Sequence, residues 1–263
     1  MNRALLVGIN AYPGCPLAGC VNDVQHMAEF LVSAHGFQES DIRLLTDARA
    51  TTGAILDRLA WLVGGVQAGD RILFHYSGHG ATFAGRNAAG EVDGVDDVIC
   101  PVDFDWSPER MIADFQFVRI FEAMPPGVLF NWISDSCHSG HLDRQMPAPV
   151  IRPRAFPVPA DMAWRVRTAR ARGLAPRGIV GELLDVGFVS GCSSDQTSAD
   201  TWIDGEAQGA LTGYLLKQLK VLPSESPLKE IVAVTAAALN RDGYDQVPQA
   251  DGARAGMPFL EGG

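Results

Sequence analysis

The sequence predicts an α/β fold in which a mostly parallel central sheet of about six strands carries helices on both faces. Short apolar runs alternate with helical patterns along the chain, and these runs are continuous rather than interleaved with polar residues. A continuous apolar run is typical of a strand buried on both faces. Hydrophobic residues make up 47% of the 263 residues, enough for a sizeable core. We expect functional side chains beyond the carboxyl ends of the strands.

The expected elements follow from apolar runs and from helix start and stop signals. Residues 4–9 and 71–76 are apolar runs short enough to be strands. A helical spacing of apolar residues begins after Asn22 or Asp23, either of which suits an N-cap, and stops near Gly36. The predicted strands cover 4–9, 42–45, 71–76, 128–134, 186–190 and 257–260. The predicted helices cover 23–36, 52–62, 114–123, 209–219 and 227–239.

The composition argues against several classes of protein. A net charge of −10 disfavours nucleic acid as a partner. No apolar run reaches the roughly 18 residues that a bilayer requires, so we expect no membrane contact. The chain has five scattered cysteines, too few for a disulfide framework and wrongly spaced for a structural zinc site. We therefore expect a cytoplasmic protein.

Charge is unevenly distributed along the chain. Residues 144–180 hold eight arginines, six prolines and a single acid, Asp161, so this window carries about +7 and the remainder about −17. The window has no sustained period, which predicts a long loop with at most a helical turn near residues 164–171. Residues 91–105 are the opposite extreme and hold six acids.

Two polar motifs end two of the predicted strands. The third strand runs into Ser77-Gly78-His79-Gly80, and the fourth runs into Asp135-Ser136-Cys137. Neighbouring strands lie roughly 5 Å apart, so His79 and Cys137 can meet at one edge of the sheet. A thiol beside an imidazole is what nucleophilic catalysis requires. Taken singly, either residue has a structural explanation: a small buried side chain for the cysteine and a capped turn for the histidine.

Backbone NH groups near the two motifs are candidates for an oxyanion hole. We expect those of Gly80 and Cys137 to contribute, together with Gly140 after the cysteine. Glycines on both sides of His79 also allow a sharp turn and the close approach of a substrate.

The two motifs resemble the His and Cys boxes of metacaspases, which are caspase-like cysteine peptidases. The boxes here read YSGHG at 76–80 and DSCHSG at 135–140. Similar segments follow in family order: GCVND at 19–23, VD at 102–103 and SGCSSDQTS at 190–198. The resemblance spans residues 4 to about 216. It implies a caspase-like fold and an endopeptidase in which Cys137 attacks the scissile carbonyl to form a thioester and His79 protonates the leaving amine.

The resemblance also implies a specificity. Metacaspases have an acidic S1 pocket, and the matching positions are Asp23 and Asp135, with Ser77 beside them. Buried carboxylates bind arginine through bidentate, charge-assisted hydrogen bonds and accept lysine as a point charge. Asp23 also has a purely structural interpretation as a helix N-cap.

Calcium activates many metacaspases, and the same pattern identifies Asp93, Asp97, Asp114 and Asp143 as candidate ligands. Hard oxygen ligands in loops suit Ca²⁺. The chain departs from the family pattern at Ala113-Asp114, where relatives often have paired aspartates. A solvated acidic loop is the competing interpretation, and we expect no cofactor to be required for the chemistry itself.

The resemblance divides one peptidase domain, 1–263, into three parts. Residues 1–143 correspond to the large subunit, 181–263 to the small subunit, and 144–180 to the intersubunit loop where relatives are processed. Eight arginines in that loop favour self-cleavage of a zymogen there, for example after Arg165, Arg167, Arg170, Arg172 or Arg177. A partner protease and a merely variable insertion are the alternatives. Metacaspases are typically monomers, and we expect one here.

Two other functions compete with an active peptidase. One is a catalytically silent caspase-like module that regulates partners, which intact His79 and Cys137 argue against. The other is a thiol hydrolase or acyltransferase of a different α/β fold, which would not explain the segment at 190–198. A flavodoxin-like binder is disfavoured because the sequence has no strand–glycine-loop–helix motif for phosphate.

Overall fold

The computed structural model describes residues 1–86, 89, 90, 92–138, 152–174, 185–192 and 196–261. A six-stranded sheet forms the centre, in the order β12-β9-β7-β3-β1-β2. All neighbouring strands in it are parallel except β12 against β9, which confirms the predicted α/β class. Its strands are β1 (Asn2–Gly8), β2 (Ile42–Thr46), β3 (Arg71–Ser77), β7 (Leu129–Asp135), β9 (Gly187–Ser190) and β12 (Gln249–Asp251).

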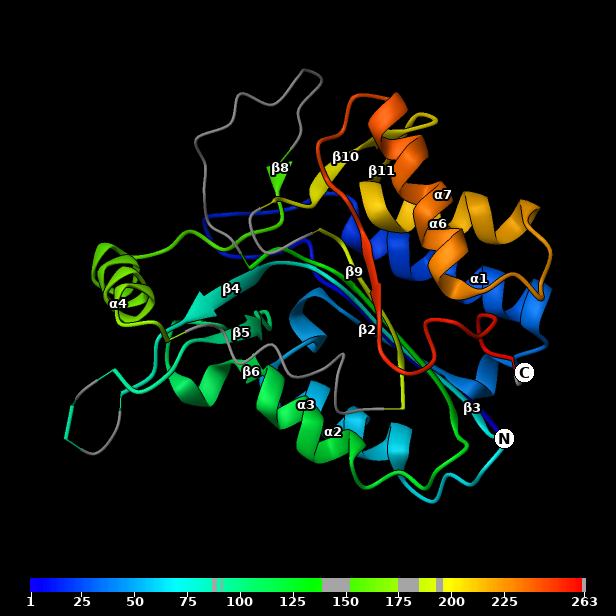
Figure 1. The fold of residues 1–263 in the computed structure, drawn as a ribbon, viewed down its shortest axis with the longest axis horizontal. Coiled ribbons are helices and arrows are strands. Elements are labelled where there is room, and N and C mark those ends of the chain that lie inside the picture. The colour runs from blue at the N-terminus through cyan, green and yellow to red at the C-terminus, as the bar shows by residue number, and fades with distance from the viewer. Residues whose placement is uncertain (87–88, 91, 139–151, 175–184, 193–195, 262–263) are drawn as a thin grey trace.

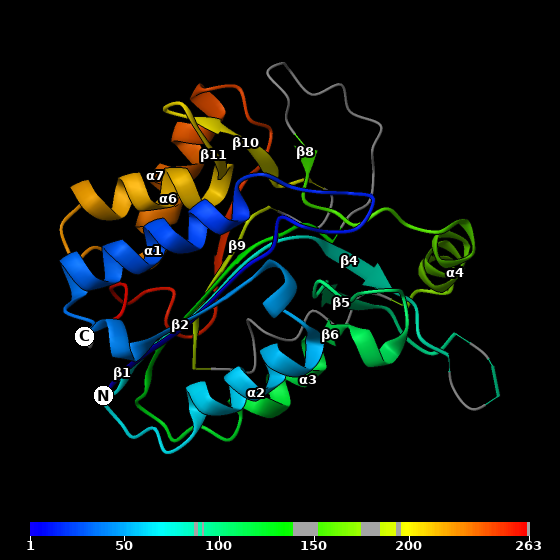
Figure 2. The same cartoon turned by 180° about the vertical axis from the view of Figure 1, so that it is seen from behind.

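Helices cover both faces of this sheet, as Figures 1 and 2 show. One face carries α1 (Cys20–His35), α6 (Ala210–Val221) and α7 (Leu228–Arg241); the other carries α2 (Thr52–Val63) and α3 (Asp114–Phe121). Alternate residues of β3 enter the two layers: Phe74 packs in the cluster on the α2 and α3 side, and Leu73 in the cluster on the α1 side. Both are fully buried, as the continuous apolar run predicts.

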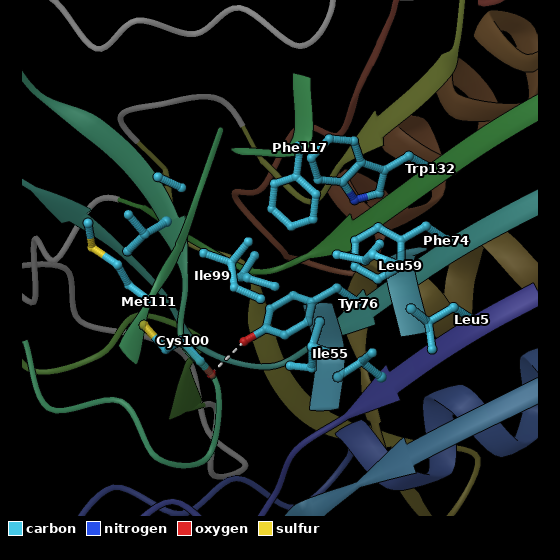
Figure 3. Packing of buried hydrophobic residues seen from close by; sticks show 14 of the residues in the cluster. Leu5, Ile55, Leu59, Phe74, Tyr76, Ile99, Cys100, Met111, Phe117 and Trp132 are labelled. Carbon is cyan, nitrogen blue, oxygen red and sulfur yellow. Dashed lines mark hydrogen bonds between the residues drawn. The ribbon is translucent and has the colours of Figure 1, made fainter. Parts of the chain in front are cut away.

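The core on the α2 and α3 side supports the loop that follows β3. Phe74, Phe117 and Trp132 form an aromatic group in this layer, with ring centroids 4.5–5.6 Å apart (Figure 3). Next to it, the Tyr76 hydroxyl oxygen lies 2.9 Å from the carbonyl oxygen of Cys100. A buried hydroxyl must find a partner, and this one ties the end of β3 to the segment after β5.

Two smaller sheets flank the carboxyl ends of the central strands, and the sequence did not predict them. One contains β4 (Gly80–Phe83), β5 (Asp96–Ile99) and β6 (Ile112–Ala113). The other contains β8 (Arg152–Pro153), β10 (Ala199–Ile203) and β11 (Glu206–Gly209). The other helices among the described residues are α4 (Ala160–Ala171) and the short 3-10 helices Glu39–Asp41, Asp47–Arg49 and Pro108–Arg110. No helix in the described part of the chain is long and apolar enough to cross a bilayer.

Three details of the predicted secondary structure are wrong. The window 144–180 contains strand β8 and the twelve-residue helix α4, where a long loop with at most a helical turn near residues 164–171 was predicted. The last strand of the sheet is Gln249–Asp251, not 257–260. Helix α1 begins at Cys20 with Gly19 at its N-cap position, so Asp23 lies inside the first turn and does not cap the helix.

Candidate active site

The sheet brings His79 and Cys137 to the same level at its carboxyl edge. In the parallel pair of β3 and β7, Ser77 lies opposite Asp135. His79 and Cys137 each follow two residues later, on loops that continue these strands. Both are buried, with 2% of His79 and none of Cys137 exposed. The motifs recognised in the sequence therefore occupy one site.

Hydrogen bonds fix the position and the tautomer of His79. Its amide donates to the Tyr12 hydroxyl at 3.1 Å, and its carbonyl accepts from the Tyr76 hydroxyl at 2.6 Å. On the ring, Nε2 lies 2.8 Å from the carbonyl oxygen of Cys15. Because a carbonyl only accepts, Nε2 carries the proton and Nδ1 keeps its lone pair. Nδ1 is buried and has no hydrogen-bond partner among the described residues.

Burial makes the neutral form of both side chains the stable one. Burial lowers the pKa of His79 to about 4, although the hydrogen bond from the ring to the Cys15 carbonyl opposes this shift. Burial also raises the pKa of the Cys137 thiol well above its usual value, and the neighbouring Cys192 adds to the shift. At neutral pH the site therefore holds a thiol and a neutral imidazole rather than an ion pair.

The thiol of Cys137 is turned toward the segment that precedes β10. Sγ lies 3.4 Å from the carbonyl oxygen of Ser198 and 3.8 Å from Sγ of Cys192, and it also contacts the Ser198 amide. Cys192 in turn lies 3.3 Å from the carbonyl of Gln196. The 190–198 segment thus forms one wall of the site; its residues 193–195 lie outside the described part of the chain.

The predicted S1 residues form a buried acidic pocket. Asp23 and Asp135 are both fully buried, and the Ser77 hydroxyl donates to Asp23 at 2.7 Å. Asp135 accepts from the amide and hydroxyl of Thr212 at 2.9 and 2.8 Å, which hold its carboxylate in place. A third carboxylate, that of Asp200 on β10, is 3% exposed and completes the pocket.

The side chain of Arg154 fills this pocket. Its Nη2 donates to Asp23 at 2.8 Å and to Asp200 at 3.1 Å. Its Nη1 donates to the Ser77 hydroxyl at 2.7 Å and lies 3.2 Å from a carboxylate oxygen of Asp135. Arg154 is fully buried. A buried guanidinium needs such partners, and here three carboxylates surround one cation.

Two glycines make room for these close contacts. A Cβ on Gly209 would lie 2.5 Å from Nη1 of Arg154 and would collide with the Asp135 carboxylate. A Cβ on Gly80 would collide with the carbonyl of Cys137. Neither glycine has a positive φ, so it is the space, rather than the backbone conformation, that excludes a side chain.

The backbone of Arg154 occupies the expected oxyanion site. Its carbonyl oxygen accepts from the Gly80 amide at 2.9 Å and from the Cys137 amide at 3.2 Å. Two convergent amides at these distances can stabilise negative charge that develops on a carbonyl oxygen. Gly140, the third residue expected here, lies outside the described residues.

The predicted calcium ligands are only partly assembled. In the described ranges, no group of three or more His, Cys, Asp or Glu side chains lies close enough to hold a metal. Asp97 accepts from the Thr82 hydroxyl at 3.2 Å, and Asp114 begins α3. One oxygen of Asp114, Oδ2, is buried and has no hydrogen-bond partner among the residues that the structure describes. Asp93 lies in the segment before β5, and Asp143 lies outside the described residues.

Comparison with known proteins identifies the family. A family model described as "Metacaspase, peptidase C14 domain" matches residues 2–144, more than half of the chain. Metacaspase-1 of Scheffersomyces stipitis is 35% identical over 94% of this chain and 69% of its own length. The chain belongs to the metacaspase family. Metacaspases are cysteine-type peptidases, so the substrates of this one are proteins or peptides.

Other relatives agree with this assignment. Metacaspase-1B of Aspergillus fumigatus is 33% identical over 94% of this chain and 68% of its own length. The chain thus spans about two thirds of the length of these fungal metacaspases. Protein GSU0716 of Geobacter sulfurreducens has a similar structure (TM-score 0.69, 25% identity, 99% and 97% of the two chains). Caspase-1 of Spodoptera frugiperda shares the fold alone (TM-score 0.62, 10% identity, 99% and 91%).

Sequence reasoning missed two residues of the metacaspase site. Asp200 lies two residues after the recognised segment 190–198, but no local pattern shows that its carboxylate points into the acidic pocket. Arg154 was counted only as one of eight arginines in a charged window. The local sequence Arg152-Pro153-Arg154 does not show which arginine enters the pocket. The pairing of β8 with β10, two segments far apart in the sequence, places Arg154 there.

Proposed function

We propose that this metacaspase is an endopeptidase that cleaves after arginine and, less efficiently, after lysine. The observation that carries the proposal is the guanidinium of Arg154 between the carboxylates of Asp23, Asp135 and Asp200. A carboxylate at P1 would be repelled by the same three groups, so the pocket disfavours aspartate strongly. Lysine can supply the charge, but its single nitrogen cannot reach all three carboxylates as the planar guanidinium of arginine does.

We assign the chemistry to Cys137 and His79. The Nε2 proton is held by the Cys15 carbonyl, which leaves Nδ1 to accept the thiol proton and to return it to the leaving amine. The amides of Gly80 and Cys137 are placed to stabilise the oxyanion. Since both reacting groups are neutral in the resting site, the thiolate forms as the substrate is attacked rather than in advance.

A P1 scan tests this proposal directly. Peptides that differ only in P1 (Arg, Lys, Asp or Leu) before a fluorogenic leaving group are incubated with wild type, Cys137→Ala and His79→Ala. We expect kcat/KM to fall in the order Arg, Lys, Leu, Asp, and both variants to be inactive while retaining the wild-type circular dichroism spectrum. Covalent labelling of Cys137 by an arginyl chloromethyl ketone would identify the nucleophile. A silent regulatory module would show neither hydrolysis nor labelling.

We also propose calcium as an activator that binds at Asp97 and Asp114. Two observations support this proposal. Among the described residues, Oδ2 of Asp114 has no hydrogen-bond partner. Burial, and then the nearby Asp96 and Asp97, raise the pKa of Asp114 to about 6. A cation beside these carboxylates would relieve that repulsion. Calorimetric titration of Cys137→Ala with CaCl₂ measures binding apart from activity; heat that persists undiminished in an Asp114→Asn variant would exclude this site.

A further inference from the structure

The segment 152–156 is bound to the site in the manner of a peptide substrate. Its β8 portion pairs antiparallel with β10, with Pro153 opposite Ala199. The Arg154 amide donates to the Ser198 carbonyl at 3.1 Å. On the other side of Arg154, the Phe156 amide donates to the Gly80 carbonyl at 2.8 Å. Extended peptides commonly bind by adding a strand to an exposed sheet edge, which is what this segment does within its own chain.

The pairing places one peptide bond at the reacting groups. The carbonyl of Arg154 accepts from the two oxyanion amides, and its side chain fills the S1 pocket. The residue after it, Ala155, forms a bridge with Gly80, directly beside His79. Phe156 packs its ring edge-on to the His79 imidazole, with centroids 5.7 Å apart. P1, the scissile carbonyl and the leaving-group side are therefore all in place for the bond between Arg154 and Ala155.

We infer that Cys137 cuts the Arg154–Ala155 bond of its own chain, and that Arg154 blocks the S1 pocket until this segment is released. The inference rests on the proposed arginine specificity and deepens it by naming the enzyme's first substrate. It differs from the sequence expectation, which pointed to arginines from Arg165 onward. Arg165, Arg167 and Arg170 belong to helix α4. A site that binds its substrate as an extended strand can cut after these residues only if the helix first unwinds.

The cleavage step is an acyl transfer followed by hydrolysis. The Cys137 thiol turns from Ser198 toward the Arg154 carbonyl carbon and loses its proton to Nδ1 of His79. A bond forms between Sγ and that carbon, the bond from the carbon to the Ala155 nitrogen breaks, and His79 gives the proton to this nitrogen. Water then hydrolyses the thioester, which yields the Arg154 carboxylate and regenerates the thiol. No oxidant or further reactant is required.

The contacts also explain why the uncut segment would inhibit. Arg154 is fully buried, so an arginine from another protein cannot enter the pocket while it stays. An intramolecular ligand benefits from a high effective concentration and competes well with dilute substrates. After the cut, the two halves of the segment are no longer joined, so each is held only by its own contacts: Arg152–Arg154 by β10 and the acidic pocket, and Phe156 by the Gly80 carbonyl.

Fragment analysis of four proteins tests the inference: wild type, Cys137→Ala, Arg154→Gln and the matched control Arg165→Gln. Arg165 is held by an exposed ion pair with Asp161 and lies outside the site. Intact masses and amino-terminal sequencing should show a wild-type fragment that starts Ala155-Phe156-Pro157. Its first-order rate should be constant over about a 100-fold range of protein concentration, because the reaction is intramolecular.

The variants should behave differently from one another. We expect Cys137→Ala to stay whole, Arg165→Gln to be cut at the wild-type rate, and Arg154→Gln to be cut at least about 100-fold more slowly at this bond. Arg154→Lys keeps the charge and replaces Arg154→Gln in the test if that variant does not fold. It should be cut at the same bond roughly 10-fold more slowly than wild type.

Three results would overturn the inference: a different first cut in wild type, an undiminished cut after position 154 in Arg154→Gln, or a rate proportional to protein concentration. The proposed function fails separately. If wild type hydrolyses P1-Arg peptides yet remains uncut at 154, the peptidase assignment stands and this inference falls. If neither wild type nor Arg154→Gln hydrolyses such peptides, the peptidase proposal and this inference fall together.

Discussion

Replacing Arg154 by alanine should destabilise the uncut protein, and the loss should depend on pH. The substitution is best made in the Cys137→Ala background, so that self-cleavage does not interfere. It removes the guanidinium that lies between Asp23, Asp135 and Asp200. Removing one partner of a buried ion pair costs about 3–5 kcal/mol of the free energy of unfolding. Because water can enter the vacated pocket, we expect about 3 kcal/mol at pH 8.

The pH dependence follows from Asp23. Burial raises its pKa to about 6, and Arg154 is the main influence that opposes this rise. Without Arg154 the pKa rises further above the unfolded value of about 3.9. An acid whose folded pKa is the higher one is destabilising when ionised, so stability is regained as pH falls through the folded pKa. Each unit of pKa is worth about 1.4 kcal/mol, so the deficit of the variant should shrink by at least ~1 kcal/mol between about pH 8 and 5.

Urea unfolding, followed by tryptophan fluorescence at both pH values, measures this effect. Burial lowers the pKa of His75 and of His79 to about 4, so both proteins lose stability as pH falls below about 6.5. The quantity to compare is therefore the difference in free energy of unfolding between variant and parent, because most of the histidine contribution cancels in it. Arg165→Ala in the same background is the control and should cost less than about 1 kcal/mol. A deficit for Arg154→Ala equal to that of the control, or one unchanged by pH, would refute the reasoning.

Three further predictions follow from the site. Gly209→Ala should lower kcat/KM for P1-Arg peptides at least about 100-fold, because the added Cβ would enter the position of the guanidinium. The control is Gly53→Ala in α2, where the added Cβ would meet open space and kcat/KM should not change. Asp200→Asn should lower kcat/KM for P1-Arg peptides roughly 10-fold, which corresponds to the loss of one charge-assisted hydrogen bond. An unchanged kcat/KM would show that Asp200 does not contribute to the S1 pocket. Alkylation of Cys137 by iodoacetamide in uncut protein, followed by peptide mass mapping, should still rise with pH at pH 9, because burial raises the thiol pKa well above its usual value; a plateau below pH 8 would contradict this.

The sequence was most informative where local pattern decides the structure. The apolar runs of β1, β3 and β7 are buried on both faces, and this made the parallel sheet predictable. The boxes at 76–80 and 135–140 then placed His79 and Cys137 on adjacent strand ends, because the ends of parallel strands share one edge.

What could not be predicted depends on contacts between distant segments. Helix α1 starts at Cys20 rather than at Asp23 because the amides before it donate to Asp200, far away in sequence. Helix α4 has no clear amphipathic pattern and buries only Met162 and Ala169, so the sequence indicated no more than a helical turn near residues 164–171. The choice of Arg154 among eight arginines is made by the register of β8 on β10, which the sequence does not reveal.

The most direct test of the account compares peptides with arginine or citrulline at P1. Citrulline has nearly the shape of arginine but no charge, so the comparison isolates the attraction of the three carboxylates from the fit of the side chain. With cut, active enzyme we expect kcat/KM for arginine to exceed that for citrulline by roughly 100- to 1000-fold, as the loss of two or more buried charge-assisted contacts requires. Equal values for the two peptides, or faster cleavage after aspartate, would contradict the assignment of Asp23, Asp135 and Asp200 as the S1 pocket of an arginine-specific metacaspase.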